Sequence, residues 1–319
     1  MLDPNKIPLG IIGLGKMGGF HLQKAVVHPE VDVVGVYDPH VRAADLGARF
    51  PGIRLYSDVA SLLLDTDAVV VASPTPTHFD LASRALRAGV DVLVEKPIAE
   101  TVEQAERLRD LARSYSCLLQ VGYLERYRLA RLVDPTFSPT NVIAERLNAN
   151  PGRESSIDVI ADLMIHDLDL VLSLMQRMPV ELHSWGERVK TDSTDEAEAH
   201  LLFDSGERAR IRASRVSADP KRVVVLESGG TRHLLDLERN TRTVTTENGP
   251  AAEVFSAGSL DPLALQLDAF VHNVKTRTPP LVGVTAGIQT LRLVQQIQRR
   301  LMPFTDGPAG DRAIQKELQ

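Results

Sequence analysis

The residues whose types and spacing best suit catalysis are an acid and a histidine four positions apart. Asp162 and His166 lie in an apolar stretch that also holds Leu163 and Ile165. Residues four apart share one face of an α-helix, so the carboxylate can orient the imidazole ring. Histidine titrates near neutrality and is a candidate general base for removing a hydroxyl proton. From spacing alone, a core histidine with its own carboxylate partner remains open, as does a metal pair, which we do not expect because the sequence has no cysteine cluster and no HExxH motif.

A lysine follows a short apolar run in the sequence Glu95-Lys96-Pro97. If the run Val90–Val94 is a strand of a parallel sheet, Lys96 lies at the carboxyl end of that strand, where open α/β sheets bind their ligands. An ammonium group there can donate a hydrogen bond to a substrate oxygen and stabilise charge as it develops. A solvated lysine is the alternative, and sequence alone does not show whether the peptide bond to Pro97 is cis.

A glycine turn near the start of the chain could hold phosphates. The apolar run Ile7–Ile12 is followed by Gly13-x-Gly15-x-x-Gly18 and then by a helical pattern. The three glycines would permit a tight turn, a close approach of backbone to a pyrophosphate, and close packing of helix on strand. A strand, a glycine turn and a helix in this order predict a dinucleotide-binding site, with the phosphates at the helix N-terminus.

The second apolar run is followed by an acid whose charge favours NAD over NADP. Asp38 ends the run Val31–Tyr37, twenty positions after Gly18. A carboxylate there accepts hydrogen bonds from ribose hydroxyls and repels a 2′-phosphate, so we expect NAD rather than NADP, although Arg42 lies close in sequence. Lys16 and Met17, at the start of the helix, belong to the same expected cofactor site.

A proline-containing turn follows the next buried strand pattern. Ser73, Pro74 and Thr75 come after the run Asp67–Ala72, and the turn would line the cofactor groove. Position alone favours a structural role for His78.

Three further residues could contact a substrate at the junction between the two halves of the chain. Tyr123 and Arg126 lie in Gly122-Tyr123-Leu124-Glu125-Arg126-Tyr127, and Arg153 follows Pro151-Gly152. Arginines bind anionic groups well, and ligand sites often form between domains. Ordinary surface arginines are an equal alternative.

Two domains account for the pattern of elements. In the first 121 residues strands are expected at 7–12, 31–37, 53–56, 67–72, 90–94 and 117–121, and helices at 19–28, 58–64, 77–88 and 101–115. Farther on, strands are expected at 141–149, 180–189, 196–203, 208–216, 222–227 and 233–237, and helices at 157–176, 262–276 and 285–302. We predict an NAD-binding Rossmann domain at 1–122, with a doubly wound parallel sheet, and an α+β domain at 123–319 with an open, mainly antiparallel sheet for substrate binding and oligomer contacts. The last helix is expected to pack back on the first domain, and the open sheet predicts a homodimer or homotetramer.

Composition excludes several classes of partner. The chain has 319 residues, a formal net charge of −6 and 24% charged residues, which argues against binding nucleic acid or a membrane surface. The N-terminal sequence does not resemble a signal peptide, and we expect a cytoplasmic protein. The single cysteine, Cys117, is expected to pack as a small apolar residue.

Taken together, these motifs resemble one family. The glycine turn, Ser73-Pro74-Thr75-x-x-His78, Glu95-Lys96-Pro97 and Asp162-x-x-x-His166-Asp167 resemble the glucose–fructose oxidoreductase, inositol dehydrogenase and rhizopine catabolism (Gfo/Idh/MocA) family. The resemblance implies an oxidoreductase in which Lys96, Asp162 and His166 form a catalytic trio. It also implies that Ser73, Pro74, Thr75, His78 and Glu95 line the NAD site.

Within this family, two stretches resemble one branch. They are Gly122–Tyr127 and Asp158–Asp167. The branch oxidises the C3 hydroxyl of UDP-N-acetylglucosamine with NAD, and a separate aminotransferase uses the ketone in the synthesis of lipid A. A nucleotide-sugar substrate is therefore implied. A polyol or inositol dehydrogenase and a non-catalytic NAD(H)-sensing protein are the alternatives.

Overall fold

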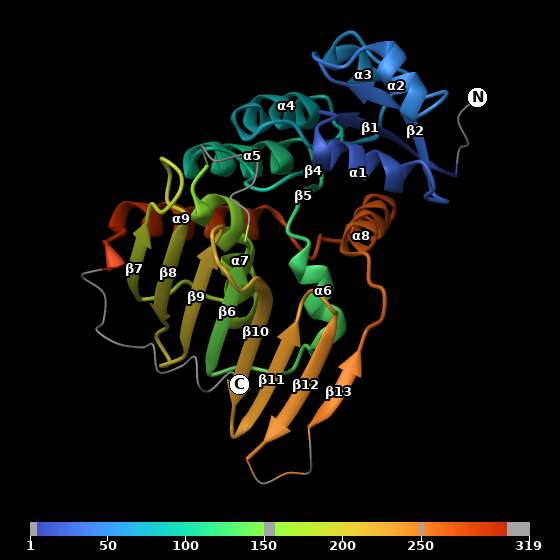
Figure 1. The fold of residues 1–319 in the computed structure, drawn as a ribbon. Coiled ribbons are helices and arrows are strands. Elements are labelled where there is room, and N and C mark those ends of the chain that lie inside the picture. Colours follow the sequence, from blue (N-terminus) through green and yellow to red (C-terminus); the bar gives the residue numbers. More distant parts are fainter. Residues whose placement is uncertain (1–4, 150–156, 248, 250–251, 305–319) are drawn as a thin grey trace. The chain divides into compact units, whose positions relative to one another are not determined.

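Contacts divide the chain into two compact units. The structure is a computed structural model that describes residues 5–149, 157–247, 249 and 252–304 (Figure 1). The first unit runs to Leu129 and takes in Leu260–Arg292, and the second comprises Ala130–Ser259 and the chain from Leu293 on. The sequence predicts a domain boundary after residue 122 and assigns residues 123–319 to one domain. The first unit instead retains helix α8 (Pro262–Thr276), which packs against α1 (Lys16–Ala25).

The first unit is built on a parallel sheet in the order β2-β1-β3-β4-β5. Its strands are β1 (Ile7–Ile12), β2 (Val31–Tyr37), β3 (Ala68–Val71), β4 (Asp91–Val94) and β5 (Leu119–Val121). Every residue of β3 and β4 is buried, as expected for strands covered on both faces. The doubly wound sheet is thereby confirmed. The expected strand at 53–56 is wrong, because this segment meets β2 only through one bridge, Leu55 to Val36.

Short-range signals explain where the helices of this unit begin. They are α1, α2 (Ala43–Arg49), α3 (Val59–Leu64), α4 (Thr75–Arg87), α5 (Val102–Ser114), α8 and the first part of α9 (Val284–Arg300). Thr101 caps α5 in a reciprocal capping box with Gln104. Helix α4 begins at Thr75, two residues earlier than expected, with Pro76 in its first turn, where a missing N–H costs no helical hydrogen bond. A further helix, α6 (Glu125–Leu132), was not predicted.

The second unit is an eight-stranded sheet in the order β13-β12-β11-β10-β6-β9-β8-β7, antiparallel except between β6 and β9. Its strands are β6 (Asn141–Leu147), β7 (Glu181–Glu187), β8 (Glu196–Leu202), β9 (Arg208–Ser214), β10 (Lys221–Ser228), β11 (Thr231–Asp236), β12 (Thr241–Thr246) and β13 (Glu253–Ser256). The mainly antiparallel sheet is confirmed. The last two strands were missed, because no residue of β12 or β13 is buried and neither carries an apolar alternation.

The helix of the second unit starts with an unexpected turn. We expected one α-helix over residues 157–176, but a π-helical segment, η1 (Ile160–Met164), precedes α7 (Ile165–Met175). A π turn bonds residues five apart and is frequent at functional sites. The α-helical spacing assumed for Asp162 and His166 therefore does not hold, because Asp162 lies in the π segment and His166 in the first turn of α7.

A buried acid holds the loop that leads into β8. One carboxylate oxygen of Asp195 accepts the backbone N–H groups of Val189, Lys190 and Thr191 at 2.8, 2.6 and 2.8 Å. The other accepts the Thr191 hydroxyl at 2.7 Å. Burial raises the pKa of Asp195, but these hydrogen bonds lower it by more, and the resulting pKa is about 2.

This acid predicts a pH-dependent stability contribution. Because the folded-state pKa lies below the ordinary value of 3.8, the contribution of about 2 kcal/mol is complete above that value and is lost as pH falls toward 2. We expect Asp195→Asn to lower the free energy of unfolding by about 2 kcal/mol at pH 7, with the difference from the parent closing in acid. Urea unfolding followed by circular dichroism measures this, with the exposed Asp192→Asn as control. A difference that stays constant from pH 7 to pH 3 would contradict the assignment.

Candidate functional site

The predicted cofactor residues gather at one edge of the first unit's sheet. Gly13, Asp38, Ser73 and Lys96 follow the carboxyl ends of β1, β2, β3 and β4 by one or two residues. After β1 the chain adds β2 on one side and then returns to place β3 on the other. Such a reversal of strand order opens a crevice at the carboxyl edge, which is where dinucleotides bind in this class of sheet.

Two of the three glycines are required by the protein's own packing. Gly13 has a φ of +90°, and an added Cβ would lie 2.6 Å from the backbone nitrogen of Ser73. A Cβ on Gly18 would lie 1.9 Å from the carbonyl oxygen of Gly13. Both distances are shorter than any real Cβ contact, so these positions need glycine for the turn itself.

Gly15 has no such reason within the chain. Its φ is −60°, it is the exposed N-cap residue of α1, and an added Cβ would meet nothing within 4 Å. The next N–H groups, of Lys16, Met17 and Gly18, begin the helix and have no earlier helical carbonyl to bond. Open space beside free helix N–H groups fits a pyrophosphate.

The glycines therefore predict two separable effects. Gly15→Ala should keep the fold and weaken NAD binding by roughly ten- to a hundredfold, from about 1–3 kcal/mol of overpacking against the ligand. Gly18→Ala should instead lower the melting temperature, because its Cβ meets backbone. Isothermal titration with NAD and thermal unfolding of both variants separate the two. Normal NAD affinity in Gly15→Ala would show that no phosphate approaches this turn.

The acid expected at the ribose is held in place by backbone. The two oxygens of Asp38 accept the N–H groups of Leu14 and His40, at 2.7 and 2.8 Å. This links the glycine turn to the end of β2. Arg42 pairs with Asp45 through two hydrogen bonds of 2.7 and 3.0 Å. The guanidinium that could have neutralised a 2′-phosphate is thus engaged elsewhere.

His78 has the backbone contacts that a structural role requires. Its buried ring lies between two carbonyls, with Nδ1 2.8 Å from the oxygen of Pro97 and Nε2 2.7 Å from that of Ser73. Burial lowers the pKa of His78 by more than these hydrogen bonds raise it. Both ring nitrogens contact protein, so His78 ties the turn after β3 to the Lys96–Pro97 peptide rather than facing a ligand. That peptide bond is cis.

The turn itself is bonded internally. The Thr77 hydroxyl donates to the Ser73 hydroxyl at 2.7 Å and to the Pro74 carbonyl at 2.8 Å. Thr77 thus lies in the first turn of α4 instead of capping it, which corrects the expectation of a helix starting there. Ser73 and Thr75 are half-buried and Pro74 is exposed.

Lys96 rests on a buried pair that the motif analysis missed. The Glu95 carboxylate contacts Nε2 of His21 at 2.8 Å, and the two side chains are 8% and 1% exposed. The other carboxylate oxygen accepts the Lys96 N–H at 3.3 Å. Glu95 therefore supports the lysine from within the sheet and does not face outward. A Cβ on Gly122 would lie 2.9 Å from this carboxylate, so a larger residue at position 122 would displace the Glu95 side chain. His21, three residues after Gly18 on the buried face of α1, was the available signal.

The three expected substrate residues have different outcomes. Tyr123 is fully buried, so the structure does not indicate a direct contact between its ring and a substrate. Arg126 is half-buried on α6. Arg153 lies outside the described residues. Contact of Arg126 and Arg153 with substrate stays a prediction.

Asp162 and His166 are both half-buried in the second unit. The backbone N–H of Asp162 donates to the carbonyl of Asp158, whose side chain accepts from the N–H of Ala161 at 2.8 Å and from Gln298 Nε2 at 2.7 Å. The start of the π segment is thus anchored to the last part of α9. Among the described residues, no group of three or more acidic, histidine or cysteine side chains is arranged to hold a metal.

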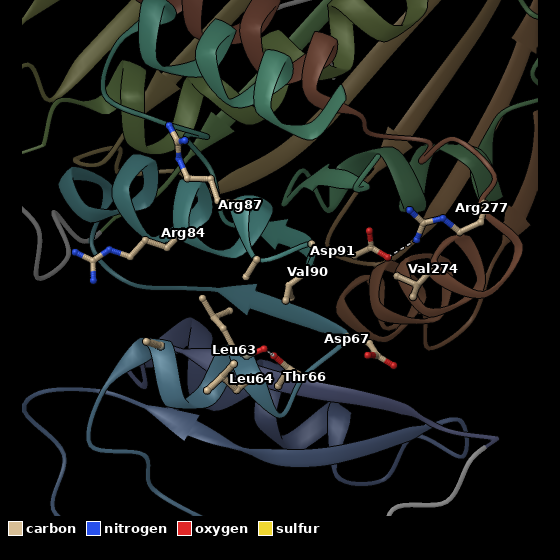
Figure 2. Close-up of a pocket in the computed structure, with 13 residues that line it drawn as sticks. Leu63, Leu64, Thr66, Asp67, Arg84, Arg87, Val90, Asp91, Val274 and Arg277 are labelled. Atoms are coloured by element: carbon tan, nitrogen blue, oxygen red, sulfur yellow. Dashed lines mark hydrogen bonds and ion pairs between the residues drawn. The ribbon is translucent and has the colours of Figure 1, made fainter. Parts of the chain in front are cut away.

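A separate hollow of about 870 Å³ occupies the opposite edge of the first sheet (Figure 2). Its walls include Asp67, which directly precedes β3, and Asp91, the first residue of β4, which pairs with Arg277. It therefore lies at the amino ends of these strands, and no predicted site residue lines it.

Cys117 behaves as a packing residue. Burial raises the pKa of its thiol to about 11, so a reactive thiolate is disfavoured. Its sulfur donates to the carbonyl of Leu86 at 3.6 Å.

Comparison with known proteins identifies the family. The model described as "Oxidoreductase family, NAD-binding Rossmann fold" matches residues 7–123, and the Gfo/Idh/MocA C-terminal domain matches residues 140–233. A UDP-N-acetylglucosamine 3-dehydrogenase of Acidithiobacillus ferrooxidans is 33% identical over 92% of this chain and 97% of its own. The chain belongs to the Gfo/Idh/MocA family. It is an NAD-dependent oxidoreductase that acts on a CH–OH group.

Other similarities agree with this family membership. A solved structure of the Acidithiobacillus enzyme superposes with a TM-score of 0.87 at 32% identity, covering 93% of this chain and 98% of that one. The scyllo-inositol 2-dehydrogenase (NAD⁺) of Bacillus subtilis is 24% identical over 87% of this chain and 89% of its own. Among the residues that the structure describes, no helix is long and apolar enough to cross a membrane.

Proposed function

We propose that this protein oxidises the C3 hydroxyl of UDP-N-acetylglucosamine, with NAD as hydride acceptor, to give the 3-keto sugar. The observation that carries the proposal is the 33% identity to a UDP-N-acetylglucosamine 3-dehydrogenase over nearly the full length of both chains. The placement of Lys96 at the carboxyl edge of the NAD-binding sheet adds support, because this is the edge at which such a sheet binds its ligands.

The proposed chemistry divides between three side chains. His166 takes the proton of the hydroxyl group as its oxygen becomes a carbonyl. Lys96 donates a hydrogen bond to that oxygen and stabilises its negative charge in the transition state. Asp162 supports the charge and orientation of His166. NAD, when bound, accepts the hydride from the same carbon, so the alcohol loses one proton and one hydride.

Partners follow from the product and from the open sheet. A 3-keto sugar is a substrate for an aminotransferase, and we propose that such an enzyme consumes it in lipid A biosynthesis. We further propose that the protein is a homodimer or homotetramer formed through the open face of the eight-stranded sheet. Light scattering of the purified protein tests the assembly.

The substrate is tested by following NADH absorbance when NAD and UDP-N-acetylglucosamine are mixed with the protein. Oxidation of a secondary alcohol by NAD is unfavourable, so an aminotransferase with glutamate should be added to remove the ketone. The proposal expects NADH to accumulate with the trap and a 3-amino sugar to appear by mass spectrometry. No turnover with the trap present would remove this substrate.

A polyol or inositol dehydrogenase is the second candidate. The similarity to scyllo-inositol 2-dehydrogenase over 87% of this chain supports it. A panel of myo-inositol, scyllo-inositol and UDP-sugars decides between the two. Turnover of an uncharged cyclitol with no turnover of UDP-N-acetylglucosamine would favour this second candidate.

A further inference from the structure

A buried ion pair lies directly beside the proposed base. In the second unit, Arg146 on β6 donates from Nε and Nη2 to the two carboxylate oxygens of Asp167 on α7, at 2.8 and 2.7 Å. The side chains are 6% and 2% exposed. Asp167 is the residue after His166. Two parallel hydrogen bonds of this kind fix orientation as well as distance.

The rotation of α7 about its axis matters because this helix begins where the backbone geometry changes. The change from π to α geometry falls between Asp162 and His166, where the N–H of Ile165 is shared between the carbonyls of Ile160 and Leu163. If the π turn relaxed to α geometry, α7 would shift by one residue, and His166 would rotate by about 100° around the helix axis.

Burial of apolar area surrounds most of α7. Eight residues of α7 are buried, and they include the consecutive run from Asp167 to Leu172. Six of the eight are apolar, and the other two are Asp167 and Asp169. Burial of apolar area is non-directional, so the buried polar groups specify how the helix is rotated. The Arg146–Asp167 pair is directional and acts at the residue next to the base.

Stability alone is a poor explanation for this pair. Desolvating two charges costs as much as their attraction returns, so apolar residues of similar size often replace a buried ion pair without loss of stability. Removing one partner is different, because it leaves a charge buried without its counter-charge.

We propose that Arg146, acting through Asp167, is a positioning residue that sets the rotation of α7 and thereby the direction of the His166 imidazole. The inference rests on the proposed role of His166 as proton acceptor. It assigns to the pair a function in turnover that is separable from folding.

The test replaces both partners together. The double variant Arg146→Met with Asp167→Leu should fold and bind NAD as the parent does. Its kcat should fall about a hundredfold, because the imidazole no longer points at the hydroxyl proton. Its KM should change little, because the groups that bind the substrate are kept. Arg146→Met alone should be unstable. The exposed pair Arg177–Asp204, just beyond the C-terminal end of α7, supplies the control Arg177→Gln with Asp204→Asn, which should leave turnover unchanged. A stable double variant with parental kcat would overturn the proposal.

A second measurement does not depend on the substrate. The ring signals of the nine histidines can be recorded by ¹⁵N–¹H NMR, with His166 identified by its loss in His166→Gln. The His166 signals should move in the double variant but not in the control. If they move while the parent oxidises no UDP-sugar, the proposed substrate fails and the positioning role stands. Unmoved signals in a folded double variant would overturn the positioning role, whatever happens to turnover.

Discussion

Lys96→Ala should lower kcat by about a hundredfold to a thousandfold while NAD binding is retained. The expected size is that of losing one charged donor to a developing oxyanion in a water-poor site. Lys96 follows β4 at the cofactor edge, and its backbone N–H is bonded to the buried Glu95. In the proposed mechanism its side chain acts through its charge, and the substitution keeps the backbone hydrogen bond to Glu95. Stopped-flow NADH formation and NAD titration by fluorescence measure the two quantities.

Controls separate the charge of Lys96 from its shape. Lys190→Ala, in an exposed loop of the second unit, should have no effect on turnover. Lys96→Arg should recover little, because a planar guanidinium presents its donors differently from an ammonium group. Full activity in Lys96→Ala would contradict the assigned role. A protein that only senses NAD would show no dehydrogenase turnover even before the change.

His166→Asn should reduce turnover by about a hundredfold to ten-thousandfold, the range lost when a positioned general base is removed. Asparagine keeps polarity and similar size but cannot take a proton at neutral pH, so folding and NAD binding should be preserved. Added imidazole should restore part of the rate if the lost group is a proton acceptor. Steady-state kinetics with and without imidazole measure this.

The matched control for His166 is His272→Asn, an exposed histidine on α8 of the first unit, which should behave as the parent. Loss of activity in His166→Asn together with loss of NAD binding would point to a folding defect. Activity near the parental level would show that another group takes the proton.

Much of the NAD-binding unit was predictable because its signals are local. The glycine turn, the uniformly apolar β3 and the capping box at Thr101 each follow from residues within a few positions of one another. What escaped depended on residues distant in sequence. Strand β12 pairs with β11, and β13 pairs with β12. Their own residues are exposed or half-buried. The β-branched residues of β12 are the signal that could have found it, but without a buried face they do not set a register or a partner.

The candidate site shows the same limit. Lys96, Asp162 and His166 could be named because their types and spacing suggest chemistry. The contacts of the neighbouring acids Glu95 and Asp167 could not be predicted, because their partners lie far along the chain. Glu95 meets His21 across 74 positions, and Asp167 meets Arg146 across 21. The π turn also escaped, since an apolar pattern of this length predicts a plain α-helix.

The open space at Gly15 has an evolutionary consequence. Gly13 and Gly18 are required by contacts inside the chain, so they would persist even in a descendant that had abandoned its coenzyme. Position 15 is under no such constraint, and in that descendant it could accept alanine or serine without harm to folding. Among diverging copies of this gene, the residue at position 15 should therefore be an early marker of which lineages still carry out redox chemistry.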